Sequence, residues 1–129
     1  MPTQTTVELC ATVASNIMNK ADTIAIFGSN QTAAEGILTA NTNLSVLGDT
    51  PGESIVAVGF DAGATIKEAV RNGTMYGAIT QSPVEMGYLT VKTLCKIAQG
   101  EEVEDISTDC YWYDADNMDD EEIAPNLYD

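Results

Sequence analysis

Residues 54–81 read SIVAVGFDAGATIKEAVRNGTMYGAITQ, and this stretch decides the fold. It begins with an apolar run over 54–60, continues with apolar residues at helical spacing over 65–71, and ends with a second apolar run over 76–80. Short continuous apolar runs are typical of strands in a buried parallel sheet, and the Asn-Gly pair before the second run is a common helix end. The stretch therefore predicts a strand, a helix and a second strand in succession.

The same alternation continues on both sides of this stretch. Working outward predicts a helix over 5–19, a strand over 23–27, a helix over 31–41, a polar loop over 41–53, a helix over 83–99, a last strand over 106–113 and one or two helical turns within 117–127. Helices that alternate with apolar strands indicate an α/β layered fold with a parallel sheet.

Size and charge limit the organisation of the chain. Its 129 residues are enough for one compact domain. The formal net charge is −15, and residues 101–129 hold 12 of the 20 acidic residues and none of the five basic ones. We therefore expect a folded lobe over 1–113 and an acidic tail over 114–129.

The same composition excludes several classes of protein. The sequence has no histidine and no basic patch, so binding to nucleic acid is not expected. The start lacks the basic and apolar parts of a signal peptide, and no apolar run reaches about 20 residues, so the chain as given is expected to be soluble.

The three cysteines, Cys10, Cys95 and Cys110, are widely spaced and form no CxxC pair. This pattern indicates neither a disulfide framework nor a zinc site, and no other metal site is predicted. We expect buried or half-buried free thiols, with a single bridge between two of the three as the alternative.

Polar side chains follow three successive predicted strands at the point where each strand ends. They are Asn30 after IAIFGS, Asp61 after SIVAVGF and Gln81 after YGAIT. The carboxyl ends of parallel strands meet at one edge of a sheet, where open α/β sheets bind ligands. A carboxylate accepts two hydroxyl hydrogen bonds, and amides both donate and accept, so the set suits a polyol.

Each of the three residues also has a purely structural interpretation. Asn30 is a suitable N-cap for the helix that begins near Gln31, and Asp61 is one for the helix near Ala64. Gln81 precedes a Ser-Pro pair and suits the turn there. Three such residues in a row at one edge favour the ligand site, and both interpretations stay open.

Two segments resemble a known family. DTIAIFGSNQTAAEGIL at 22–38 and the stretch from IVAVGFDAGATIKEAV to CKIAQGE at 55–101 resemble the second half of the type I periplasmic binding proteins of the ribose, galactose and xylose class. The resemblance runs from about Thr5 to the tail and implies a Rossmann-like lobe. It further implies an extracytoplasmic sugar-binding protein of an ABC importer, periplasmic or anchored as a lipoprotein, with the importer's permease as partner.

In that family the residues that match Asn30, Asp61 and Gln81 contact the sugar hydroxyls, and no cofactor is used. The family often has an acidic residue after the first asparagine, where this sequence has Gln31. By the same resemblance the chain supplies half of a ligand cleft, and the helix over 83–99 packs on a first lobe. Without that lobe, we expect its apolar stripe to fold back on the strands or to form a homodimer.

Two other functions are considered. The ligand-sensing domain of a lactose-repressor-family transcription regulator shares this fold, although the acidic end YDADNMDDEEIAPNLYD resembles that of exported sugar-binding lipoproteins. An enzyme is not expected, because the sequence lacks a glycine-rich phosphate loop, a GxSxG motif and any histidine to carry protons.

Overall fold

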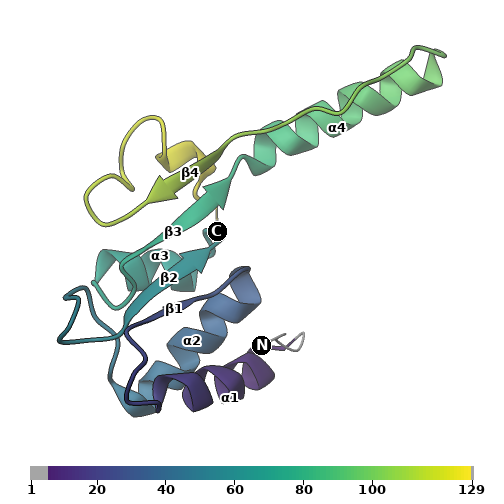
Figure 1. Ribbon diagram of the computed structural model, residues 1–129. Coiled ribbons are helices and arrows are strands. Elements are labelled where there is room, and N and C mark those ends of the chain that lie inside the picture. The colour runs from purple at the N-terminus through teal and green to yellow at the C-terminus, as the bar shows by residue number, and fades with distance from the viewer. Residues whose placement is uncertain (1–5, 129) are drawn as a thin grey trace.

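The computed structural model describes residues 6–128 (Figure 1). Its elements are α1 (Val7–Met18), β1 (Ala25–Phe27), α2 (Gln31–Leu44), β2 (Val56–Phe60), α3 (Ala64–Arg71), β3 (Gly77–Gln81), α4 (Pro83–Ala98), β4 (Cys110–Tyr113) and the 3-10 helix η1 (Ala124–Asn126). Each predicted helix and strand is confirmed, with ends that differ by a few residues. The predicted helix start at Thr5 and the last tail residue, Asp129, lie outside the described residues.

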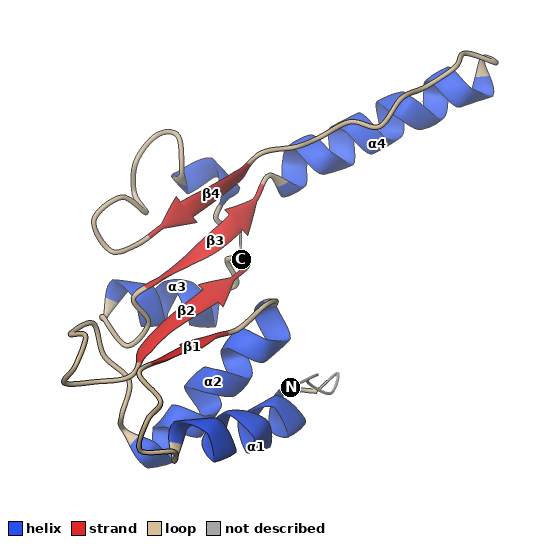
Figure 2. Cartoon of the chain, in the orientation of Figure 1, coloured by secondary structure: helices blue, strands red, loops and turns tan. Residues whose placement is uncertain are grey.

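The sheet is mostly parallel, and its strand order is β1-β2-β3-β4 (Figure 2). β1 pairs with β2 and β2 with β3 in parallel, whereas β4 pairs with β3 in antiparallel register, from Ala78 opposite Tyr113 to Gln81 opposite Cys110. The predicted α/β fold with a parallel sheet is confirmed, and the last strand adds an antiparallel edge to it. The reason is that α4 carries the chain away from the edge where β3 ends, so the chain re-enters the sheet from that same edge.

One face of the sheet carries the core. Ala57 of β2 and Ala78 of β3 are fully buried with Ala34 of α2 and Ile66 of α3, so both helices cover this face. α1 packs against α2, and contact is so close that a Cβ added at Gly36 would lie 2.4 Å from the Cβ of Cys10. Burial of this apolar surface is the main source of stability of the lobe.

The opposite face of the sheet is much more exposed, although the strands are apolar on both sides. Phe27 of β1 retains 55% of its accessible surface and Trp112 of β4 retains 38%. Val58 and Phe60 of β2, which alternate with the buried residues of that strand, are half-buried. The strand sequences are thus those of a sheet covered on both faces, while residues 6–128 cover one of them.

α4 projects away from the rest of the molecule, and residues 99–109, here called the return segment, run back alongside it (Figure 1). Pro83 stands in its first turn, as predicted, but none of residues 83–98 is buried. The predicted last strand begins at Cys110 and not at residue 106, because the return segment extends along the helix before it reaches the sheet. The helix does not fold back on the strands.

Two of the three thiols are more exposed than expected. Cys10 is buried between α1 and α2, but Cys95 and Cys110 are exposed, so the prediction of buried or half-buried thiols is wrong for these two. Cys95 lies on the projecting helix, and Cys110 begins the edge strand β4.

Residues 114–128, here called the C-terminal segment, pack on the lobe. Met118 is 2% exposed, and Ile123 and Leu127 contact the core. The carboxylates at 119–122 remain exposed. Apolar side chains that alternate with acidic ones therefore dock this segment while its charges stay in water.

Candidate ligand-binding site

The three predicted site residues lie at the edge where β1, β2 and β3 end, here called the carboxyl edge. Gln81 is the last residue of β3, Asp61 directly follows β2, and Asn30 directly precedes α2. The structure joins Asp61 to Gln81 by a hydrogen bond, and it brings Asn30 close through the adjacent residue Gln31. The parallel order of the three strands produces this convergence.

The backbone of Asp61 has an unusual conformation. Its φ angle is +75°, in the left-handed region that aspartate and asparagine tolerate better than most residues. The amide nitrogen donates a 2.7 Å hydrogen bond to the carbonyl of Ile79, which continues the ladder between β2 and β3 by one residue. The chain therefore turns sharply at Asp61, and its side chain stays at the carboxyl edge.

The Asp61 carboxylate bridges the ends of the neighbouring strands. Oδ2 accepts from the backbone N–H of Gln31 at 3.1 Å, and Oδ1 accepts from Nε2 of Gln81 at 3.1 Å. Gln31 is the first residue of α2, so the carboxylate also lies at the positive end of a helix dipole. The capping role considered for Asp61 on α3 is wrong, because Gly63 is the N-cap there and no side chain caps it.

Asn30 does cap a helix. Its Oδ1 accepts from the backbone N–H of Ala33 at 2.9 Å, and the side chain is exposed. The capping interpretation of Asn30 is thus confirmed. The cap fixes the amide plane at the carboxyl edge, and a capped asparagine still carries an NH₂ group that donates hydrogen bonds.

Sequence reasoning missed two tyrosines at this edge. The buried Tyr113 of β4 donates from its hydroxyl to the backbone carbonyl of Asp61 at 2.8 Å. Tyr128 packs against the core, and its pKa is raised by burial and by the charge of the nearby Asp61. Burial raises the pKa of Tyr113 above its usual value, with the charges of Tyr128 and Asp61 adding to the effect. Both phenols therefore stay protonated at neutral pH, and the Tyr113 hydroxyl acts as a donor.

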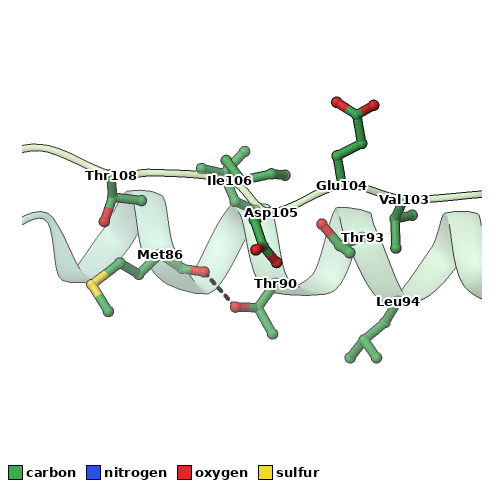
Figure 3. A pocket seen from close by; sticks show the side chains of 10 residues that line it. Met86, Thr90, Thr93, Leu94, Val103, Glu104, Asp105, Ile106 and Thr108 are labelled. Carbon is green, nitrogen blue, oxygen red and sulfur yellow. Dashed lines mark hydrogen bonds between the residues drawn. The ribbon is translucent and has the colours of Figure 1, made fainter.

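A separate cleft of about 430 Å³ lies between α4 and the return segment (Figure 3). Met86 and Leu94 line it from the helix, and Val103 and Ile106 line it from the return segment. None of the three predicted site residues lines this cleft. Its apolar walls belong to the projecting part of the molecule, away from the carboxyl edge.

The described residues hold no alternative centre of metal chemistry. Among residues 6–128, no group of three or more His, Cys, Asp or Glu side chains is placed to hold a metal ion. No helix in that range is long and apolar enough to cross a membrane. The carboxyl edge presents a carboxylate and two amides, groups whose acceptors and donors can pair with hydroxyl groups.

Comparison with known proteins fits this geometry. The family model described as a periplasmic binding protein domain matches residues 1–102. The chain belongs to the periplasmic binding protein family. The family resemblance predicted from the sequence is confirmed, and the lobe is accordingly a periplasmic-binding-protein lobe with a mostly parallel sheet.

Three relatives show how much of the family the chain represents. It is 36% identical over 93 residues to the ribose import binding protein of Haemophilus influenzae, a match over 71% of this chain and 30% of that protein. An ABC transporter solute-binding protein from Agrobacterium vitis with bound D-fucose is 28% identical with a TM-score of 0.88, over 99% of this chain and 43% of that one. A Brachyspira murdochii protein, named as an ABC transporter and LacI family transcriptional regulator, is 34% identical with a TM-score of 0.85, over 99% and 42%.

The chain thus spans less than half the length of these relatives. The family is that of extracytoplasmic binding proteins, and the two transport relatives are named for binding and not for catalysis.

Proposed function

We propose that this chain is a sugar-binding lobe of an extracytoplasmic solute-binding protein that serves an ABC importer. The observation that carries the proposal is the Asp61 carboxylate, which Gln31 and Gln81 hold at the carboxyl edge and whose backbone turns there at a φ of +75°. The Agrobacterium vitis relative, of similar fold over 99% of this chain, has bound D-fucose. Periplasmic or lipoprotein-anchored location and delivery to the importer's permease are part of the same proposal.

In this proposal Asn30, Asp61 and Gln81 bind the sugar hydroxyls. A carboxylate has about four acceptor positions. Two of those on Asp61 are occupied by Gln31 and Gln81, which leaves the others for hydroxyl donors. The NH₂ group of Gln81 donates a hydrogen bond to Asp61, so the amide oxygen of Gln81 is left to accept a hydrogen bond from a sugar hydroxyl. We propose binding without catalysis, and the sugar should be recovered unchanged.

We further propose that α4 packs on a second lobe in the complete binding site. The helix has no buried residue, and large apolar side chains such as Val91 and Leu94 are 63% and 59% exposed. A lobe that closes over the carboxyl edge dehydrates the sugar and adds hydrogen bonds from its other side. One lobe alone makes about half of these bonds, each worth about 0.5–1.5 kcal/mol net, so its affinity should be weak.

In the absence of a second lobe, we propose that the chain forms a homodimer through α4. Exposed apolar surface of this extent favours association, and the exposed second face of the sheet adds to it. Light scattering at micromolar concentration should give twice the 13.7 kDa mass of the chain. Val91→Glu on α4 should give the monomer, and Thr42→Glu on the exposed side of α2 should leave the dimer intact. A monomeric wild type would reject the dimer.

The second candidate is the ligand-sensing domain of a lactose-repressor-type regulator. It is favoured by the name of the Brachyspira murdochii relative, which combines transporter and regulator. Both candidates bind a small ligand at the carboxyl edge, so sugar binding alone does not separate them. A neighbouring gene for a permease or ATPase supports the importer, and specific operator binding by the complete gene product would support the regulator.

A thermal-shift screen of pentoses and hexoses with the complete gene product tests the proposal. A sugar present at about 100 times its Kd should add roughly 2.7 kcal/mol to the free energy of unfolding, which is a shift of several degrees. A response to one sugar or a related pair supports the proposal. No response to any sugar at millimolar concentration would contradict the proposed function.

A further inference from the structure

A buried side chain of β4 reaches the turn that carries Asp61. Tyr113 lies opposite Ala78 of β3, and β3 separates β4 from β2 in the sheet (Figure 2). The Tyr113 hydroxyl nevertheless donates a 2.8 Å hydrogen bond to the backbone carbonyl of Asp61, which directly follows β2. The phenol therefore spans β3 and joins the last strand to the proposed sugar site. The family model stops at residue 102, so it does not include this tyrosine.

This hydrogen bond is enclosed by the protein. Tyr113 is fully buried within the hydrophobic core, and Ala62, whose peptide group contains the accepting carbonyl, is fully buried as well. A buried carbonyl that loses its partner has little access to water in exchange. The Tyr113 hydroxyl should therefore matter more for the conformation of this turn than an exposed hydroxyl would.

The bond fixes the second of the two backbone polar groups of Asp61. The amide N–H donates to Ile79 of β3 at 2.7 Å, and the carbonyl accepts from Tyr113 of β4. Asp61 has a φ of +75°, and a residue in this region depends on the surrounding structure to keep it there. A turn that is fixed at both its N–H and its C=O keeps the carboxylate where Gln31 and Gln81 donate to it.

We propose that Tyr113 is a positioning residue of the sugar site, whose hydroxyl holds the Asp61 turn in the conformation that presents the carboxylate to sugar hydroxyls. This inference rests on the proposed function and extends the site to β4. In this role Tyr113 does not touch the sugar and acts through the backbone of Asp61. A carboxylate that is fixed before the ligand arrives loses less entropy on binding, so the Tyr113 hydroxyl should contribute to affinity.

The test compares Tyr113→Phe with Thr23→Val in the complete gene product. Each substitution removes one hydroxyl that donates a 2.8 Å hydrogen bond to a backbone carbonyl, and each keeps the shape of the rest of the side chain. Thr23 donates to Ile17 and precedes β1, so it lies at the opposite edge of the sheet from Asp61. Both variants should lose stability, but Tyr113→Phe alone should disturb the site.

The probes are D-ribose and D-fucose, titrated by calorimetry. When a turn spends part of its time outside the binding conformation, the apparent Kd rises in inverse proportion to the fraction that remains. We expect a roughly fivefold rise in Kd for Tyr113→Phe, which corresponds to the loss of one hydrogen bond of about 1 kcal/mol. Thr23→Val should change the Kd by less than about twofold, because the Asp61 turn keeps its full population.

A second readout, in the ligand-free protein, separates positioning from general support of the fold. The side-chain NH₂ group of Gln81 donates to the Asp61 carboxylate at 3.1 Å, so its NMR resonances report where that carboxylate lies. Tyr113→Phe keeps the aromatic ring, so a shift of these resonances reflects the lost hydroxyl. We expect the shift in Tyr113→Phe and not in Thr23→Val. A tyrosine that merely packs in the core would leave the Gln81 resonances unchanged.

The outcomes distinguish the two proposals. Binding of neither sugar by the wild type counts against the proposed function, and the Gln81 resonances then still decide whether Tyr113 controls the carboxylate. Binding by the wild type with an unchanged Kd in Tyr113→Phe overturns the role of Tyr113, as do unchanged Gln81 resonances. An equal rise in Kd in Thr23→Val also overturns it, because stability alone would then set the affinity. A raised Kd confined to Tyr113→Phe, together with shifted Gln81 resonances, supports the positioning role.

Discussion

Substitutions of Asp61 separate two contributions to stability, that of its left-handed backbone conformation and that of its side-chain hydrogen bonds. Asp61→Ala places an alanine at φ +75°, which costs about 1–2 kcal/mol. It also removes the acceptors of the 3.1 Å bonds from Gln31 and Gln81, at about 1 kcal/mol each. The free energy of unfolding should therefore fall by about 3 kcal/mol, a large part of the roughly 5–15 kcal/mol of a typical domain.

Asp61→Asn is the matched control. Asparagine tolerates the left-handed backbone, keeps one acceptor oxygen, and offers an NH₂ group to a reoriented Gln81 amide. It should cost about 1 kcal/mol. Asp61→Gly should fall between the two, because glycine accepts the backbone angle but makes neither hydrogen bond.

Urea denaturation of the three variants, followed by far-UV circular dichroism, gives the free energies from midpoint and slope. The order of stability should be Asn, then Gly, then Ala. If Asp61→Ala were as stable as Asp61→Asn, then neither the strain nor the two hydrogen bonds would contribute as the structure indicates.

Three further predictions concern the surroundings of the site. Asn30→Ala should lower the free energy of unfolding by about 1 kcal/mol through loss of the α2 cap, whereas Asn30→Ser should keep most of it; equal thermal stability of the two would contradict the cap. Gly36→Ala should lower the free energy of unfolding by about 1–3 kcal/mol, because the added Cβ lies 2.4 Å from that of Cys10. Gly87→Ala on α4, where an added Cβ meets nothing within 4 Å, should raise it by up to about 1 kcal/mol. Denaturant melts in which both variants changed the free energy of unfolding in the same direction would refute the packing argument. Burial raises the pKa of Tyr113, so its contribution to stability is complete below pH 10.0, the unfolded value, and declines above it by up to about 1.4 kcal/mol per pH unit; urea melts between pH 9 and 11.5 should show this decline, and Tyr113→Phe should reduce it.

Local patterns were sufficient to predict most of the fold. The apolar runs and helical spacings around residues 54–81 predicted the order of helices and strands, and the strand ends placed Asp61 and Gln81 together. These features depend on residues near each other in sequence. The rule that parallel strands end at one edge of a sheet then predicted which of these residues lie close together in space.

What sequence reasoning missed depends on contacts between distant residues. The direction of β4 follows from the path of α4 and the return segment, which no local period reveals. The tyrosines escaped notice because Tyr113 meets Asp61 across 52 positions and Tyr128 follows a strongly acidic stretch. A usable signal was present in the apolar residues Ile123, Leu127 and Tyr128, whose presence among the carboxylates is typical of a segment that docks on a core.

The sequence patterns also did not predict which apolar surfaces are exposed. An apolar stripe on residues 83–99 predicts a buried helix, and apolar strands predict a sheet covered on both faces. Residues 6–128 leave both apolar surfaces exposed, and the proposed second lobe is the partner that would cover the helix. This is the physical reason that Cys95 and Phe27 are exposed here.

The central claim is that Asp61 binds sugar at the carboxyl edge. Isothermal titration of the complete gene product with the sugar selected by the thermal-shift screen tests it most directly, using wild type, Asp61→Asn and the exposed-site control Asp22→Asn. A hydrogen bond to a charged group contributes about 1.5–3 kcal/mol, so Asp61→Asn should raise the Kd at least tenfold and Asp22→Asn should leave it unchanged. Equal affinity of wild type and Asp61→Asn would contradict the account.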